Sequence, residues 1–502
     1  MSAYRVPMSM DEYRKPLGLR WKTHRAACTA ILFLLVAVVG CDGEKSDRPN
    51  VLLISIDTLR MDHTSLAGYE RDTTPALAEW AKAGVVFEQA YSASSWTLPG
   101  MSMLLTGQVQ VENEGRIFPR QAPLAETMRE RGYRTGAVIA NPLLTSERGF
   151  DRGFDYFNIR TDENPQSREW LAPGVTERGI EFMSKGEEPF CLLLHYFDPH
   201  DPYLPIDGIN FPPFGSEERY KAFQAALPDE DKPKFSRQVY TGIEKRIAAY
   251  DAEVFQTDFY LAQLFEWMDD QGLSENTIVI VTADHGEGLW QRAATIGETP
   301  KEVFFPELYF EHGVQLYGEQ IHVPLVFRGP GVPVGVRNNT AFSLLDVVPT
   351  ILSLLDLPVA SSMPGMALLP EIPKVRTSPV FSICSRGRSV TVDSRYRLHQ
   401  PREYKIKQGQ LPELFDIVND PLELTPLEDP AMEERLRGLI TDWVAAGEAI
   451  DWGDIAPIDM DKLREEMHAV GYVAEDMFGE DIGKSEGSDE KKTSPAQSES
   501  DD

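Results

Sequence analysis

The strongest constraint on the fold is a set of short, nearly continuous apolar runs that recur along the chain. They include "NVLLISI" (50–56), "PFCLLLHYF" (189–197), "NTIVIVTAD" (276–284) and "VPLVFRGPG" (323–331). A run of this length without polar alternation is typical of a strand whose two faces are both covered, as in a parallel sheet. We therefore expect a central sheet that other elements cover on both sides.

Segments with helical patterns lie between these runs. "TPALAEWAKAG" begins with a cap-like Thr74 and Pro75 and ends at Gly84, which are start and stop signals of a helix. Residues 123–141 predict a helix, a glycine stop and a strand, and residues 245–272 have apolar residues at helical spacing. This alternation predicts an α/β fold with a doubly wound, mostly parallel central sheet flanked by helices, and a functional site at the carboxyl ends of the strands.

The pattern changes near Ser378. "RSVTVDSRYRLHQ", "YKIK" and "ELFDI" are short strand-like runs with turns between them, which predict a small antiparallel sheet. "EERLRGLITDWVAAG" then predicts a closing helix. We expect a large domain over residues 49–375, a C-terminal subdomain over residues 376–475 and a disordered acidic tail over residues 476–502.

The first 41 residues have the features of an export signal. "LRWKTHRAACTAILFLLVAVVGC" has a basic stretch and then an apolar run of about 15 residues, which is short for a membrane span. Small residues precede Cys41, as in a bacterial lipobox, so we predict a lipoprotein-type signal peptide over 1–41 and a linker over 42–48. The protein would then be exported and anchored by lipid to a membrane of a bacterial cell envelope. An uncleaved N-terminal anchor is the alternative.

The composition excludes one class of partner. The 502 residues include 49 basic and 79 acidic side chains, for a formal net charge of −30. Nucleic acid binding requires a positive surface that neutralises phosphates, so we expect no nucleic acid partner. Two of the four cysteines lie in the N-terminal segment, and the others, Cys191 and Cys384, are too few for a disulfide framework.

Polar side chains follow several of the predicted strands. Asp57 ends the first one, Asp284 and His285 follow "TIVIVT", and Thr97 lies in "SSWTLPGMSMLLTG". Because the carboxyl ends of parallel strands meet at one edge of a sheet, these four side chains are expected to converge. Two carboxylates, an imidazole and a hydroxyl predict a site for one divalent cation with mixed ligands. Such a cation lowers the pKa of a ligating hydroxyl and polarises an ester.

Three further histidines require an interpretation. His200 in "YFDPHDPY" and His312 in "FEHGVQLY" are candidates to stabilise an oxyanion or to protonate a leaving group. His195, which lies within an apolar run, is interpreted as a core histidine with satisfied hydrogen bonds. The long segment 290–313 is either a flap over the site or a plain surface loop.

The order of these motifs resembles that of sulfatases, a family within the alkaline phosphatase superfamily. Residues 48–107 resemble the family's N-terminal half, and "APLAETMRERGYRTGAVIAN", "ERGFDRGFDYF", "HYFDPHDPY", "TADHGEGL", "FEHGVQLYGEQIHVPLVFRGPG", "LLDVVPTILSLL" and "ELFDIVNDPLEL" follow in the expected order. The resemblance covers roughly residues 49–450. It implies an alkaline-phosphatase-like fold, a sulfatase-like catalytic domain over 49–375, and a metal-dependent hydrolase of sulfuric or phosphoric esters.

The resemblance also implies roles for individual positions and for the cofactor. It implies calcium, although a site with a histidine ligand would also suit manganese or zinc. The family's functional positions are occupied here by Asp57, Asp284 and His285 (metal ligands), Thr97 (nucleophile and metal ligand), and His200 and His312 (oxyanion or leaving group).

The chain departs from the family pattern at several of these positions. Sulfatases carry Cys or Ser in a Cys-x-Pro-Ser-Arg motif and convert it to formylglycine. Threonine is not a substrate of that conversion, so no formylglycine is expected at Thr97. The other departures are Met101 at the arginine position, Thr58 in place of the second Asp of a pair, His285 in place of Asn, and the lack of a lysine between His312 and Val323.

A threonine nucleophile favours phosphorus esters over sulfate esters. A formylglycine hydrate expels sulfate by collapsing to the aldehyde, and a sulfated threonine has no such route. A phosphothreonine is resolved by water, or by another alcohol, in a second displacement. We therefore expect a small-molecule, glycan or lipid ester as substrate, with phosphate or phosphonate ahead of sulfate.

Two other functions remain open from the sequence. A membrane-tethered phosphotransferase would use the same residues to move a head group between alcohols. A non-catalytic binder of sulfated or phosphorylated glycans would be consistent with the missing arginine, although the other site residues argue against it. The sequence leaves the oligomeric state open.

Overall fold

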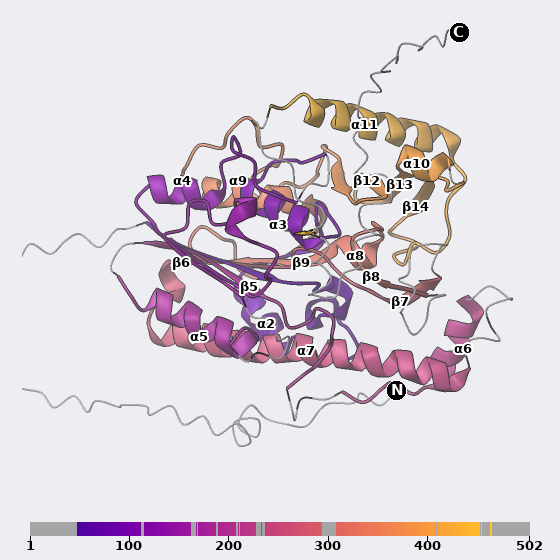
Figure 1. Cartoon of the computed structure of the whole chain (residues 1–502), viewed down its shortest axis with the longest axis horizontal. Coiled ribbons are helices and arrows are strands. Elements are labelled where there is room, and N and C mark those ends of the chain that lie inside the picture. The colour runs from indigo at the N-terminus through magenta and orange to yellow at the C-terminus, as the bar shows by residue number, and fades with distance from the viewer. Residues whose placement is uncertain are drawn as a thin grey trace, which may run out of the picture.

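An eight-stranded sheet lies between two layers of helices in the computed structural model of the protein (Figure 1). The structure describes residues 48–463, except 112–114, 162–166, 168, 187–188, 207–208, 210, 227–231, 233–235, 294–307, 408, 452 and 454–461. In spatial order the strands are β10 (Val336–Ser343), β2 (Val85–Tyr91), β9 (His322–Arg328), β6 (Thr277–Thr282), β1 (Asn50–Ile56), β5 (Phe190–Tyr196), β3 (Arg134–Ile139) and β4 (Tyr156–Ile159).

The sheet is mostly parallel, as predicted. Neighbouring strands β6, β1, β5, β3 and β4 pair in parallel, and so do β2 and β10. Strand β9 is antiparallel to both of its neighbours, β2 and β6. The run at 323–331 was expected to be a buried strand, and it is one, but it runs against the others.

Helices cover both faces of the sheet (Figure 1). One layer holds α2 (Pro75–Trp80), α5 (Ala172–Met183) and α7 (Arg237–Asp270), and the other holds α3 (Thr97–Thr106), α4 (Leu124–Glu130) and α9 (Val347–Leu354). Every residue of β1 and β5 is buried, as the double covering requires. The other elements that the structure describes in this part of the chain are η1 (Met61–His63), η2 (Ser65–Ala67), η3 (Ala81–Ala83), η4 (Ser146–Arg148), α6 (Glu217–Ala226), η6 (Ser274–Asn276), β7 (Gly288–Ala293), β8 (Leu308–Glu311), α8 (Gly318–Ile321) and η7 (Leu344–Asp346).

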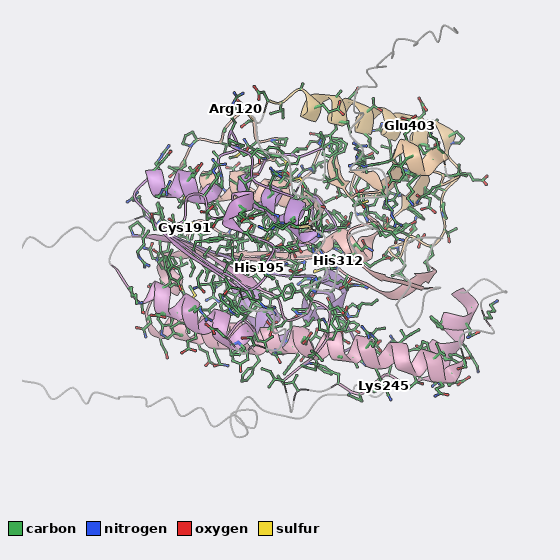
Figure 2. All side chains as sticks on the ribbon, viewed as in Figure 1. Arg120, Cys191, His195, Lys245, His312 and Glu403 are labelled. Carbon is green, nitrogen blue, oxygen red and sulfur yellow. The ribbon has the colours of Figure 1, made fainter. Side chains whose placement is uncertain are left out.

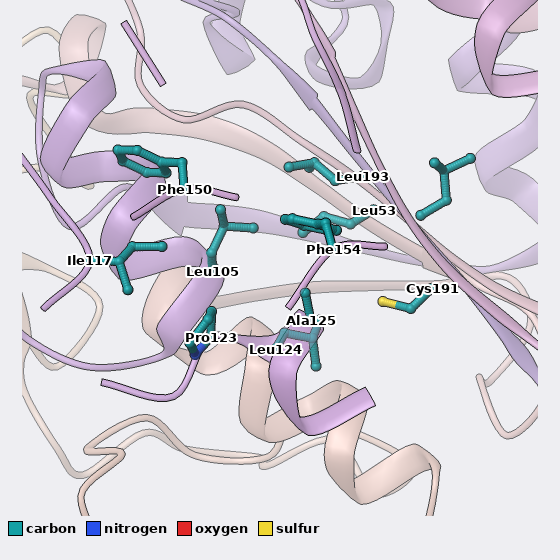
Figure 3. A pocket seen from close by; sticks show the side chains of 11 residues that line it. Leu53, Leu105, Ile117, Pro123, Leu124, Ala125, Phe150, Phe154, Cys191 and Leu193 are labelled. Atoms are coloured by element: carbon teal, nitrogen blue, oxygen red, sulfur yellow. The ribbon is translucent and has the colours of Figure 1, made fainter. Parts of the chain in front are cut away.

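A small cavity beneath α4 lies within this core and is not a candidate functional site. Its lining is apolar and includes Leu53 of β1, Cys191 of β5, Leu105 of α3 and Phe154 (Figure 3). Its volume is about 10 Å³, which is room for a single water-sized sphere. Cys191 and Cys384 are both buried free thiols.

A four-stranded antiparallel sheet follows, as the sequence predicts. It consists of β11 (Val380–Ile383), β12 (Gly387–Val392), β13 (Tyr396–Pro401) and β14 (Glu413–Asp416), and α11 (Pro430–Glu448) packs on it. The strand expected at "YKIK" is wrong, because residues Glu403–Lys407 form the short helix α10. Four residues of alternating pattern are too few to distinguish a strand from one helical turn.

The helix predicted at 74–84 is present, but its cap differs from the prediction. The Thr74 side chain makes no capping bond to α2 and accepts a hydrogen bond from Ser65 N instead. The capping group is Asp258 of α7, whose carboxylate accepts from Ala76 N and Leu77 N at 2.8 Å each. A cap that comes from 182 residues away leaves no local signal in the sequence.

Several predictions lie outside the described residues. These are the signal peptide and lipid site over 1–41, most of the linker, the acidic tail, and the middle of the segment between β7 and β8. Among the helices that the structure describes, none is both long and apolar enough to cross a membrane.

Helix α7 holds the segment that follows β1 in two ways. Tyr250 Oη donates to Thr58 O at 2.9 Å and accepts from Arg60 N at 3.1 Å. The next residue, Asp251, is fully buried and contacts His63 Nδ1 at 2.7 Å, Tyr69 Oη at 3.0 Å and the Arg71 guanidinium.

Replacing Asp251 with alanine should therefore destabilise the protein strongly. It leaves the buried Arg71 guanidinium without its carboxylate, and we expect the free energy of unfolding to fall by about 3–5 kcal/mol. Chemical denaturation measures this value. The control is Asp269→Ala on the exposed end of the same helix, which should change it by less than about 0.5 kcal/mol. Equal effects of the two substitutions would contradict the role given to Asp251.

Candidate active site

Four adjacent parallel strands bring polar side chains to one edge of the sheet. Asp57 follows β1, Asp284 follows β6, His195 lies near the end of β5, and Asn141 follows β3. Registers Ser55↔His195 and Ile139↔His195 place these strand ends level with one another. Asn141 Nδ2 donates to Asp57 Oδ2 at 3.0 Å, so the cluster spans all four strands.

The four predicted metal ligands are brought together. His285 Nε2 lies 3.0 Å from Thr97 Oγ1, 3.5 Å from Asp57 Oδ1 and 3.4 Å from Asp284 Oδ2. All four side chains are fully buried. One imidazole nitrogen is thus surrounded by two carboxylate oxygens and the threonine hydroxyl, and this arrangement agrees with the predicted convergence.

His195 is not the satisfied core histidine that the sequence suggested. Neither of its ring nitrogens has a hydrogen-bond partner among the described residues, and Nε2 lies 3.6 Å from Asp57 Oδ2. Asp57, His195 and Asp284 each offer a ligand atom, and these atoms lie within 4.8 Å of one another. Figure 2 shows His195 deep in the interior, beside the strands of the central sheet. The apolar sequence around His195 predicted a core position. Its neighbour Asp57 follows a different strand, so the local sequence could not show this contact.

The electrostatics of this cluster fit a bound cation. Burial, reinforced by the negative charge of Asp284, raises the pKa of Asp57 well above its usual range, and burial raises that of Asp284 to about 6. Asp57 Oδ1 and Asp284 Oδ2 have no hydrogen-bond partner among the described residues. Buried carboxylate oxygens and imidazole nitrogens without partners are rare unless an ion satisfies them. The residues present therefore fit a divalent cation, as is typical of the family that the sequence resembles.

The two other predicted histidines lie beside this cluster. The His312 ring is 4.3 Å from the His285 ring and 5.2 Å from the His200 ring, between centroids. His312 Nδ1 is 3.1 Å from Glu287 Oε1, and His200 Nδ1 is 2.6 Å from Asp201 O. Burial lowers the pKa of both His200 and His312 to about 3 and raises the pKa of Glu287 to about 7. Figure 2 places His312 near the middle of the molecule, as it does His195.

Two departures from the sulfatase pattern have structural explanations. Met101 is buried, and its Sδ accepts a hydrogen bond from Ser55 Oγ of β1 at 3.6 Å, so an uncharged side chain fills the position of the motif arginine. Thr58 has a positive φ of 57°, and its hydroxyl donates to Pro199 O at 2.8 Å. That hydroxyl ties the segment after Asp57 to the segment that carries His200.

Sequence reasoning missed three residues that support the site. Asn141 follows β3, and the rule applied to Asp57 would have found it. Glu287 lies three residues after Asp284, a spacing with no signal of its own. Arg60 is buried, pairs with Asp62 at 2.6 Å and donates from Nη1 to Glu287 O at 3.0 Å. Its role depends on a contact across 227 residues, which no local pattern encodes.

The turn that carries His285 is packed without spare room. Gly286 N donates to Gln320 O at 2.7 Å, and Glu287 N donates to Glu319 O at 2.9 Å, so α8 holds the turn. A Cβ added at Gly286 would lie 2.2 Å from Glu319 O. On the other side, a Cβ added at Gly100 of α3 would lie 3.0 Å from Asp284 O.

Substitution of Gly286 by alanine should displace the turn and with it the His285 and Glu287 side chains. A displacement of about 1 Å at reacting groups lowers turnover by about 100-fold, and we expect at least that loss of kcat together with weaker metal retention. The control is Gly438→Ala on α11, where an added Cβ meets nothing within 4 Å. Steady-state kinetics and metal analysis measure both variants, and a normal kcat for Gly286→Ala would contradict the packing argument.

Comparison with known proteins places this arrangement in a family. Residues 49–357 match the sulfatase family model. Arylsulfatase K of Bos taurus is 24% identical over 481 residues, which cover 80% of this chain and 84% of that protein.

Solved structures with the same fold include proteins named for both sulfur and phosphorus chemistry. A protein in complex with its substrate D-glucosamine-2-N,6-O-disulfate has a TM-score of 0.60 at 17% identity, covering 80% of this chain and 99% of that chain. The phosphonate monoester hydrolase of Agrobacterium radiobacter has a TM-score of 0.58 at 20% identity, covering 80% and 96%. Because the family model spans more than half of its length, the chain belongs to the sulfatase family of the alkaline phosphatase superfamily and is a hydrolase of ester bonds.

Proposed function

We propose that the protein is a metal-dependent hydrolase of phosphate or phosphonate esters, in which Thr97 is the nucleophile. The observation that carries the proposal is the position of the Thr97 hydroxyl, 3.0 Å from His285 Nε2 and beside the carboxylates of Asp57 and Asp284. A solved phosphonate monoester hydrolase with the same fold supports phosphorus chemistry, while the sulfatase relatives keep sulfate esters as the competing substrates.

The place of Thr97 in α3 suits nucleophilic attack. Thr97 is the first residue of the helix, so the positive end of the helix dipole lies next to its hydroxyl. The dipole favours an alkoxide and the negative charge of an arriving phosphoryl group. In sulfatases the motif arginine supplies positive charge at this site, and this chain has Met101 at that position. The helix dipole supplies part of the missing stabilisation.

Attack by Thr97 Oγ1 on the phosphorus forms a phosphothreonine and breaks the bond to the leaving-group oxygen. A second, in-line attack by water then breaks the Thr97 ester and releases phosphate or phosphonate. Thr97 Oγ1 and His285 Nε2 lie 3.0 Å apart, so a cation held by both would position this oxygen and help it to release its proton to solvent before the attack. Neither step needs the aldehyde chemistry of formylglycine.

His312 is the residue that we assign to the leaving group. Its Nδ1 contacts Glu287, which fixes the ring and directs Nε2 away from that carboxylate. The pKa of His312 is low because the ring is buried. A phosphoryl dianion beside the ring raises it, so the imidazole gains a proton when substrate is present. His200, 5.2 Å away between ring centroids, is assigned to the transferred group.

The donor set favours a transition metal over calcium. Asp57, Asp284 and Thr97 offer oxygen, and His195 and His285 offer nitrogen. Calcium takes oxygen ligands, whereas imidazole suits zinc, and the two carboxylates of the set also suit manganese. The bound ion would supply Lewis acidity to the ester and lower the pKa of the Thr97 hydroxyl. We propose zinc first and manganese second.

The signal peptide that the sequence predicts supports a proposal about where the enzyme acts. A lipid on Cys41 would hold it at a membrane of the cell envelope, facing substrates outside the cytoplasm. Loss of membrane association in a Cys41→Ala protein would support this, and unchanged association would contradict it.

Removing the Thr97 hydroxyl should abolish turnover without emptying the metal site. We expect Thr97→Ala to lower kcat by at least about a thousand-fold, whereas Thr97→Ser retains a hydroxyl and should stay within about tenfold. Assays with an aryl phosphate, an aryl phosphonate, an aryl phosphodiester and an aryl sulfate measure both variants and identify the preferred ester. Turnover by Thr97→Ala near the wild-type rate, or repeated turnover of the sulfate alone, would contradict the proposal.

His195 should contribute to metal affinity and metal choice. We expect His195→Gln to weaken zinc binding by at least about tenfold, while His322→Gln on β9, outside the cluster, should leave it unchanged. Elemental analysis after dialysis measures metal content, and the visible absorption of cobalt-substituted protein reports the nitrogen ligands independently of activity. Tight calcium binding that is unaffected by His195→Gln would contradict the assignment.

A further inference from the structure

A second cavity, of about 330 Å³, lies where the C-terminal sheet meets the segment that follows His312. One wall is residues 314–317, and the other comes from β12, β13 and the connection into β14. Figure 1 shows these strands next to α8, away from the helix layer formed by α5 and α7. Unlike the void beneath α4, this cavity has a volume in the range of ligand sites.

Arginine is the prevailing charged residue in the lining of this cavity, although the chain has a formal net charge of −30. Arg386 and Arg388 line it, and the single carboxylate of its lining, Glu413, accepts a hydrogen bond from Tyr317 Oη. Arg402 lies close by, since Arg402 N donates to Arg386 O at 2.8 Å. Guanidinium groups gathered at a concave site bind planar or tetrahedral oxyanions through paired N–H donors.

The remaining lining suits a ligand with hydroxyl groups. Gln315, Gln400, Gln410 and His399 add amide and imidazole groups that both donate and accept hydrogen bonds. Val314, Leu316 and Pro401 form apolar walls between them. A few convergent polar groups on an apolar surface are the usual composition of a small-molecule site.

The cavity and the candidate active site share one short segment of the chain, residues 312–314. Val314 lines the cavity, and His312 lies in the active site, so their Cα atoms are at most about 7 Å apart. Ser385 holds the intervening Gly313, because its N and Oγ both approach Gly313 O, at 3.4 and 3.3 Å. Cys384 Sγ also donates to Val314 O at 3.3 Å. A ligand seated in the cavity would therefore lie next to the leaving-group side of the reaction.

We propose that this cavity is a recognition site for a second anionic group of the substrate, a carboxylate, sulfate or phosphate carried on a hydroxyl-bearing leaving group. The inference rests on the proposed ester chemistry, because it places both groups on one molecule. The ester reacts at Thr97, the leaving-group oxygen faces His312, and the remainder of the substrate extends over Gly313 to Arg386 and Arg388.

Binding to a protein that cannot turn over tests this site. The probe is a chondroitin sulfate hexasaccharide, with neutral maltohexaose as its uncharged counterpart, titrated by calorimetry into the Thr97→Ala protein. We expect the anionic probe to bind at least about tenfold more tightly than the neutral one, and the preference to fall with added salt. Arg388→Gln and Arg386→Gln should each weaken its binding by about tenfold.

Two controls make the result decisive. Arg435→Gln on the exposed face of α11 removes the same charge elsewhere and should leave binding unchanged, and thermal melting confirms that each variant is folded. Equal affinity for the two probes would overturn the proposed recognition site, and so would equal effects of Arg388→Gln and Arg435→Gln. The proposed function would still stand in that case if the wild-type protein turns over an aryl ester. Charge-dependent binding at Arg388 without turnover of any ester would support the site and overturn the proposed function instead.

Discussion

The structure depends on two buried carboxylates, Asp57 and Asp284, that follow adjacent parallel strands and lie on either side of His285 Nε2, 3.5 and 3.4 Å from it. One oxygen of each has no hydrogen-bond partner among the described residues, and burial raises the pKa of both groups. Two such charges are costly in a dry interior unless a cation balances them. The strand order forces this proximity, because β6 and β1 pair in parallel from Asn50↔Thr277 to Ser55↔Thr282 and every residue of both strands is buried. The possible cation site is thus a consequence of the fold itself.

The surrounding elements hold these charged side chains in place and position the Thr97 hydroxyl beside them. Helix α7 fixes the segment after Asp57 through Tyr250, α8 holds the turn that carries His285, and α3 presents Thr97 at its positive end. Compared with the sulfatase pattern, a threonine replaces the formylglycine precursor, and histidine nitrogen stands where an oxygen ligand is expected. In the function that we propose, both changes favour displacement at phosphorus on a softer metal over calcium-dependent sulfate chemistry.

The sequence predicted those features that local pattern determines, and missed those that depend on contacts between distant segments. The continuous apolar runs identified β1, β5, β6 and β9, and their polar ends identified Asp57, Asp284 and His285. Periodicity could not show that β9 runs antiparallel, nor that "YKIK" forms a helical turn. His195 was misjudged because its neighbour Asp57 belongs to another strand, and Glu287 and Arg60 were missed because their contacts are equally remote. The pattern of polar residues had already marked Thr97, His200 and His312 as candidates, and the motif resemblance added the roles that each was expected to have.

The most direct measurement is the stereochemical course of the reaction at phosphorus, followed with the metal-loaded enzyme and a chiral, oxygen-isotope-labelled phosphorothioate ester. Its hydrolysis in water of a third oxygen isotope gives a thiophosphate product that is chiral at phosphorus. Attack by Thr97 and then by water is two in-line displacements, each of which inverts the phosphorus. Net retention is therefore the expected result. Net inversion would mean that water attacks the ester directly, that Thr97 forms no covalent intermediate, and that its hydroxyl serves only to position other groups.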